Sequence, residues 1–66
     1  MNPEYVEAWK NEGNASYSRG EYKTALEAYE RATKINPKDA DAWYKKGNAL
    51  FELKRDCEAL EAYEKA

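Results

Sequence analysis

The sequence predicts an all-α fold made of two stacked antiparallel helix–turn–helix hairpins, and two observations support this prediction. First, residues 2–32 align with residues 36–66 at an offset of 34 positions, and 14 of the 31 aligned pairs are identical. Second, apolar residues in each copy recur three or four positions apart, which is the spacing of one face of an α-helix. A period of roughly 20 to 50 residues indicates repeats that bury their apolar faces against one another.

Composition limits the organisation and the function. The chain has 66 residues, one cysteine, no histidine and a net charge of −2. We therefore expect a single domain over residues 1–66, with repeat one at about 2–35 and repeat two at about 36–66. An internal disulfide and a histidine-based metal site are excluded, and no cofactor is expected. The acidic balance argues against nucleic acid as a partner. The polar start and the lack of a long apolar run predict no signal peptide and no membrane segment. A lone cysteine without an export signal fits a cytoplasmic location.

The first helix is expected at about residues 4–18. Asn2 is a suitable N-cap, and Pro3 follows it at a position where the missing N–H has no cost. The residues on one face of this segment are Trp9, Gly13, Ser16 and Tyr17. A glycine inside a helix costs roughly 1 kcal/mol relative to alanine. We therefore expect Gly13 to allow the close approach of a neighbouring helix.

The second helix is expected at about residues 21–35, after a short break. Gly20 lies in this break and suits the left-handed conformation that ends many helices. The apolar face of the second helix consists of Tyr22, Ala25, Leu26, Tyr29 and Ala32. This spacing is that of an amphipathic helix packed on one side.

The second repeat is expected to form the same hairpin, with helices at about 40–53 and 56–66 and Asp39 as the cap of the first of them. Its inner turn differs, because Lys54 stands where the first repeat has Gly20, and a left-handed lysine costs about 1 kcal/mol. Two outcomes are open. The segment forms an ordinary turn with Asp56 as the cap of the fourth helix, or it straightens and exchanges that helix with a second molecule.

The large side chains of these faces form the predicted core. One hairpin cannot bury both of its faces, so neighbouring hairpins must stack. The residues expected to be largely buried are Trp9, Tyr17, Leu26, Tyr29, Trp43, Phe51, Leu60 and Tyr63.

These residues resemble a known family, the tetratricopeptide repeat, whose 34-residue unit carries the pattern W-x2-L-G-x2-Y, then A-x3-F, then P. The first unit matches at Trp9, Gly13, Ala25, Tyr29 and Pro37, and the second matches or comes close at Trp43, Gly47, Leu50, Ala59 and Tyr63. Glu12 and Lys46 depart from the pattern at equivalent positions where leucine is usual. The resemblance covers essentially the whole chain and implies a fragment of a right-handed α-solenoid that acts as a protein-binding scaffold.

The sequence contains no residue pattern of an enzyme. Without histidine there is no obvious base for a nucleophile, and three scattered glycines form no phosphate-binding loop. Cys57 lies between Asp56 and Glu58, and neighbouring carboxylates do not favour a reactive thiolate. We therefore predict a non-catalytic protein.

The resemblance implies that the first helix of each repeat lines a groove for an extended peptide or a partner segment. The residues predicted to line it are Glu7, Lys10, Asn14 and Tyr17 in the first repeat, and Asp41, Tyr44, Lys45 and Asn48 in the second. Lysines would pair with acidic side chains of the partner, asparagines would hold its backbone, and Tyr44 would pack on a side chain. The alternative for this face is a plain solvated surface.

A second class of function is self-association. The outer side of the fourth helix carries Leu60 and Tyr63, and no polar capping helix follows it in the sequence given. Two molecules could then stack head to tail, as an open heterologous contact.

Overall fold

The computed structural model describes the backbone of residues 3–66 and the side chains from Tyr5 onward, and it confirms the all-α prediction. The helices are α1 (Pro3–Ser18), α2 (Tyr22–Ile35), α3 (Ala40–Glu52) and α4 (Asp56–Lys65), and this range contains no strand. Their bounds agree with the predicted ones to within one or two residues. The predicted N-cap at Asn2 lies outside the described residues.

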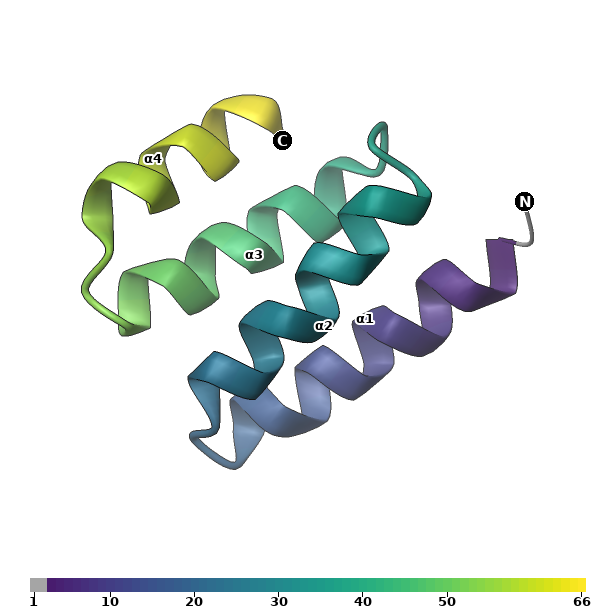
Figure 1. Ribbon diagram of the computed structural model, residues 1–66, viewed down its shortest axis with the longest axis horizontal. Coiled ribbons are helices and arrows are strands. Elements are labelled where there is room, and N and C mark those ends of the chain that lie inside the picture. The colour runs from purple at the N-terminus through teal and green to yellow at the C-terminus, as the bar shows by residue number, and fades with distance from the viewer. Residues whose placement is uncertain (1–2) are drawn as a thin grey trace.

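The helices form two antiparallel hairpins that stack side by side. Figure 1 shows α1 against α2, then α3 beside α2, and α4 against α3, so that helices consecutive in the chain are neighbours in space. The Cα atoms span 32 × 26 × 13 Å, which is the thin shape of a single stack. The stacked-hairpin architecture predicted from the 34-residue period is therefore present.

Each hairpin closes where a glycine of its first helix meets a tyrosine of its second. A Cβ atom placed on Gly13 would lie 2.5 Å from Cε1 of Tyr29, and one on Gly47 would lie 2.6 Å from Cε1 of Tyr63. No real side chain tolerates such a distance. The two glycines are therefore required because a tyrosine ring lies directly against the backbone of the facing helix, and the close approach of a helix at Gly13 was predicted from the sequence.

The core is formed mainly by α2 and by the helix faces that contact it. One buried cluster contains Ala25, Leu26, Tyr29, Ala49, Leu50, Ala59 and Ala62, with Tyr17, Trp43, Leu53 and Tyr63 packed against it. A second contains Val6, Ala32 and Ala42, with Trp9 and Ile35 packed against it. Of the predicted core, Leu26 and Tyr29 are buried, whereas both tryptophans, Tyr17 and Tyr63 are partly buried.

The prediction was wrong for Phe51 and Leu60. Each has 59% of its surface exposed. They are the counterparts of Tyr17 and Leu26, which contact the second hairpin, but no element among residues 3–66 covers the same positions of the second hairpin. Their side chains are apolar and in the predicted helical register, and their exposure follows from the missing neighbour alone.

Both inner turns have the same backbone geometry despite their different sequences. Gly20 has φ = 79° and Lys54 has φ = 64°. In each turn the next N–H bonds back to a carbonyl five positions earlier, from Glu21 to Ser16 and from Arg55 to Leu50, at 2.9 Å in both cases. The turn at Lys54 is therefore closed, and the straightened alternative is not the conformation found.

The start of α4 differs from the prediction. Its N-cap is Arg55, which makes no side-chain capping bond, and Asp56 is the first helical residue. Asp56 therefore does not cap the helix. It lies in the first turn, where a negative charge interacts favourably with the helix dipole.

Candidate functional site

The eight residues predicted to line a groove all lie on α1 and α3, but the structure divides them into separate groups. Asn14, Tyr17, Lys45 and Asn48 line one cavity of about 260 Å³, together with Ser18 and Tyr29. Glu7, Lys10 and Asp41 meet at a separate charged cluster. Tyr44 lies apart from both groups. The cavity is therefore the part of the predicted groove that the structure assembles.

The two asparagines in this cavity are held by tyrosines of the paired helices. The hydroxyl of Tyr29 donates to Oδ1 of Asn14 at 2.6 Å, and the hydroxyl of Tyr63 donates to Oδ1 of Asn48 at 2.6 Å. The amide NH₂ groups make no hydrogen bond to the described part of the chain. Each asparagine is thus fixed by its acceptor atom and presents its two N–H donors.

The cavity also contains a cation. Lys45 is partly buried, and its ammonium forms no ion pair with the side chains that the structure describes. At the far edge, the hydroxyl of Tyr17 donates to Oε2 of Glu52 at 3.2 Å and so joins the two repeats. Burial, followed by the charge of Glu52, raises the pKa of Tyr17 above its usual value. Tyr17 therefore remains a neutral donor.

Lys10 does not face the groove as an available cation. Only 8% of the residue is exposed, and Nζ lies 3.0 Å from Asp39, 3.4 Å from Glu7 and 3.4 Å from Asp41. The other carboxylate oxygen of Asp39 accepts from the backbone N–H of Ala42 at 3.2 Å, so Asp39 caps α3 as predicted. Lys10 therefore binds α1 to the start of α3 and joins the two repeats.

The protonation of this ion pair follows from its partners. Burial disfavours the charge on Asp39, but the Lys10 ammonium and the N–H of Ala42 outweigh it and hold the pKa of Asp39 below its usual value. Burial also disfavours the charge on Lys10, but Asp39 and Glu7 outweigh it and raise the pKa of Lys10. Both residues are thus charged at neutral pH.

Tyr44 lies at the outer edge of this face. More than half of it is exposed, and its ring centroid is 5.7 Å from that of Tyr63. Tyr44 is the counterpart of Lys10, and the carboxylate that Asp39 offers to Lys10 has no equivalent beside Tyr44 among the described residues. Its aromatic surface is available to a partner.

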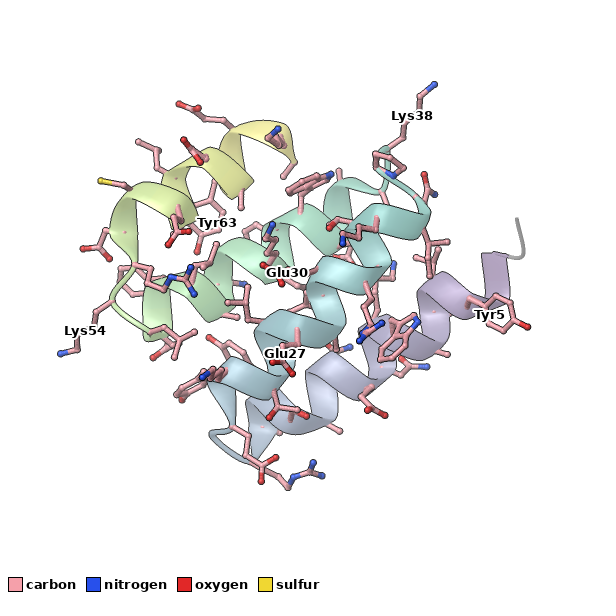
Figure 2. The ribbon with its side chains drawn as sticks, viewed as in Figure 1. Tyr5, Glu27, Glu30, Lys38, Lys54 and Tyr63 are labelled. Carbon is pink, nitrogen blue, oxygen red and sulfur yellow. The ribbon has the colours of Figure 1, made fainter. Side chains whose placement is uncertain are left out.

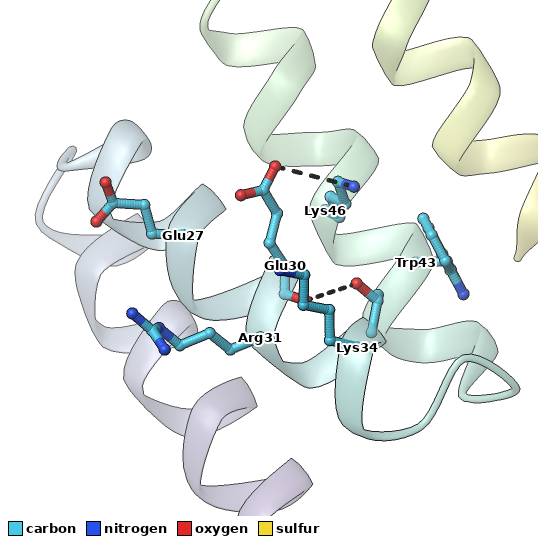
Figure 3. Close-up of a pocket in the computed structure, with 7 residues that line it drawn as sticks. Glu27, Glu30, Arg31, Lys34, Trp43 and Lys46 are labelled. Carbon is cyan, nitrogen blue, oxygen red and sulfur yellow. Dashed lines mark hydrogen bonds and ion pairs between the residues drawn. The ribbon is translucent and has the colours of Figure 1, made fainter.

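A second and larger cavity, of about 770 Å³, lies between α2 and α3 and was not predicted from the sequence. Glu27, Glu30, Arg31, Thr33, Lys34, Trp43 and Lys46 line it (Figure 3). The ammonium of Lys46 lies 3.9 Å from a carboxylate oxygen of Glu30 and 4.9 Å from the ring centroid of Trp43. The departure of Lys46 from the usual leucine was the signal in the sequence, since a charge there must find a partner on α2.

The described residues offer little to catalysis or to a membrane. The side chains of residues 5–66 contain no group of three His, Cys, Asp or Glu placed to hold a metal ion, and Cys57 is exposed on α4. None of α1 to α4 has the length and apolar character needed to cross a bilayer.

The comparison with protein families gives one match. The family model described as TPR repeat matches residues 13–54, which is 42 of the 66 residues of the chain. The match begins inside α1 and ends at the turn between α3 and α4, so it contains both asparagines, Lys45 and the joint between the repeats. A search of curated proteins finds no match to this chain.

Proposed function

This chain belongs to the TPR repeat family, and on that premise we propose that it is a non-catalytic module that binds an extended peptide along the face formed by α1 and α3. TPR repeats in general are protein–protein interaction modules. The proposal concerns which face binds and what chemistry it selects.

The observation that carries the proposal is that the cavity on this face presents hydrogen-bond donors. Asn14 and Asn48 have their oxygen atoms occupied by tyrosine hydroxyls, which leaves their NH₂ groups. Lys45 adds an ammonium group without an ion-pair partner among the described side chains. Donors fixed in this way are complementary to acceptors, which in a peptide are backbone carbonyls and carboxylates. The preferred ligand is therefore an extended segment with an acidic side chain.

The roles of the predicted residues follow from this arrangement. Lys45 pairs with the acidic side chain, the NH₂ groups of Asn14 and Asn48 donate to main-chain carbonyls, and Tyr44 packs on an apolar side chain next to it. Tyr17 forms one wall. Glu7, Lys10 and Asp41 act indirectly, because their mutual ion pairs fix the angle between the repeats.

The experiment begins with a peptide-library screen that identifies a ligand, followed by affinity measurements on single variants. Lys45→Ala removes the cation. Asn48→Asp keeps an acceptor for the Tyr63 hydroxyl but removes the donors, so the fold is preserved. We expect each variant to weaken binding by about tenfold, the cost of a charge-assisted hydrogen bond.

The matched control is Lys34→Ala, which removes one lysine from the cavity between α2 and α3. Its affinity should equal that of the unaltered chain. If Lys34→Ala weakens binding while Lys45→Ala and Asn48→Asp do not, the ligand occupies the other face and the assignment to α1 and α3 is wrong.

The second candidate function is self-association, which the exposure of Phe51 and Leu60 favours. Apolar side chains with about 60% exposure, in helical register on one flank, are unfavourable in water unless another surface covers them. Because the turn at Lys54 is closed, we favour head-to-tail stacking over exchange of α4.

A further inference from the structure

We propose that two copies of this chain stack with the outer face of α4 on the outer flank of α1, in the register of the internal α2–α3 joint, and that Glu12 of one copy then opposes Glu64 of the other. This rests on the second candidate function above and shares only Tyr44 with the proposed peptide-binding face. It assigns Glu12 the role of limiting self-association.

The template is the contact that the first hairpin makes with the second. Leu26 and Tyr29 of α2 lie in one buried cluster with Ala49 and Leu50 of α3. Three ion pairs connect the repeats at this joint: Glu30–Lys46 at 3.9 Å, Lys10–Asp39 at 3.0 Å and Lys10–Asp41 at 3.4 Å. The repeats are related by 34 positions. Adding 34 to the partner in the first repeat gives its equivalent on the free face of the second hairpin, and subtracting 34 from the partner in the second repeat gives its equivalent on the outer flank of α1.

The apolar part of the joint is largely reproduced by this shift, although Leu50 becomes Ser16. Leu26 becomes Leu60, which is identical in type and 59% exposed. On the receiving flank, Ala42 and Ala49 of α3 become Ala8 and Ala15 of α1, which are identical in type and exposed on the helix surface. A second copy therefore finds a large side chain opposite a stripe of small ones, as inside the chain.

The polar part of the joint is changed. The Lys10–Asp39 ion pair becomes Tyr44 against Tyr5, two rings that are 54% and 60% exposed. Tyr5 projects from the outer end of α1 in Figure 2. These rings supply an aromatic contact in place of a salt bridge. Stacking is thus still possible at this point.

The Glu30–Lys46 pair becomes Glu64 against Glu12, and an attraction becomes a repulsion. Both glutamates are exposed. Like charges placed opposite one another weaken an association and exclude the wrong partner more than they alter the fold. The chain therefore has an apolar surface for stacking together with a charge that keeps the stacking weak.

Sedimentation equilibrium of the chain at low and high salt, up to millimolar concentration, tests this proposal. Salt screens the repulsion, so the unaltered chain should associate more tightly as salt rises. Glu12→Lys restores the charge pattern of the internal joint and should tighten association by about fivefold at low salt, with the salt dependence reversed. Glu64→Lys should do the same.

The double variant Glu12→Lys with Glu64→Lys places two lysines opposite each other and should return to weak association, which identifies the register. The control is Glu27→Lys, which changes the net charge by the same amount at a position on α2 outside the proposed contact between copies, and this variant should associate like the unaltered chain. If all variants remain monomers at every salt concentration, or if Glu27→Lys tightens association as much as Glu12→Lys, the proposal is overturned. Peptide affinity at the α1–α3 face is measured in the same variants at a concentration where the chain is monomeric and should not change, so failure of this proposal is separable from failure of the other.

Discussion

Helices α2 and α4 carry the same six residues, Ala-Leu-Glu-Ala-Tyr-Glu, yet they have different environments. Leu26 in α2 is 4% exposed, whereas Leu60 in α4 is 59% exposed. In α2 six residues are buried, and in α4 only Ala59 and Ala62 are. The difference is that α2 packs extensively against a helix on each side, whereas α4 packs extensively against α3 alone among the described residues. An identical sequence thus has its burial decided by its neighbours.

Some of the residues that differ between the repeats lie where one repeat meets the next. Within each hairpin, the glycine–tyrosine contact and the asparagine–tyrosine hydrogen bond are the same in both repeats. At the joint, Lys10 corresponds to Tyr44 and Lys46 to Glu12. The hairpin interior therefore defines the unit, and the joint positions define which surface each unit can pack on.

The largest contrast should come from removing the leucine of each repeat. Leu26→Ala leaves a cavity between α2 and α3 and should lower the free energy of unfolding by about 3 kcal/mol. Leu60→Ala removes mostly exposed surface and should change it by less than about 0.5 kcal/mol. Urea denaturation of both variants at a concentration where the chain is monomeric measures the difference.

Equal losses for the two leucine variants would contradict the comparison, because they would mean that Leu60 is covered in solution. Repeating the urea denaturation at high protein concentration tests whether a second molecule covers Leu60. If stacking occurs, Leu60→Ala should become destabilising only there, since association stabilises the folded state by mass action.

The next largest effect should come from Lys10. Lys10→Met leaves the partly buried carboxylate of Asp39 without its cation and should cost about 2 kcal/mol at neutral pH. Tyr44→Met, at the equivalent position, should cost little because Tyr44 is 54% exposed. The folded state lowers the pKa of Asp39 from its usual 3.8, so this stability is present above that value and is lost as the pH falls. Urea denaturation at neutral and acid pH measures it, and an equal cost at both would contradict the ion-pair explanation.

The fold was predictable because it depends on local spacing and on a repeat. The 34-residue period, the close approach of a neighbouring helix at Gly13 and the cap at Asp39 all act within one hairpin or at its ends, and each was found as expected. The exposure of Phe51 and Leu60 was not predicted, because helical periodicity identifies an apolar face but does not show whether another helix covers it.

The candidate site was harder to predict for a similar reason. Sequence spacing placed Lys10 and Lys45 on helices facing the same side, and only the structure shows that the first is surrounded by carboxylates from both repeats. The cavity containing Trp43 and Lys46 depends on the angle between α2 and α3. That angle is set by side-chain packing across the joint, which residue spacing within a helix does not encode.

A smaller effect should appear at alkaline pH and should be greater in the first repeat. Burial, followed by the charges of Tyr17 and Asp41, raises the pKa of Tyr29 from 10.0 to about 12. Its contribution to stability is fully present below pH 10 and is lost as the pH rises towards 12, by about 1.4 kcal/mol at pH 11. Tyr29→Phe should reduce this loss. Tyr63→Phe should reduce this loss less, because Tyr63 is only partly buried and the pKa of its hydroxyl is raised less. Urea denaturation at pH 9 and 11 measures the loss, and an equal reduction in both variants would argue against the difference in burial.

The smallest contrast should lie in the two inner turns, which share one backbone geometry with different residues. Gly20→Ala forces an alanine to φ = 79° and should cost about 1 kcal/mol.

Lys54→Gly relieves the strained lysine at φ = 64°, visible at its turn in Figure 2, but adds the conformational entropy of glycine to the unfolded chain. The relief of strain slightly exceeds the entropic cost, so the free energy of unfolding should rise by about 0.5 kcal/mol, with helix content and oligomeric state unchanged. Lys54→Ala keeps the strain and serves as the control. A shift from dimer to monomer in Lys54→Gly would instead show that the turn opens in solution, because only an open turn allows α4 to leave α3 and pack on a second molecule.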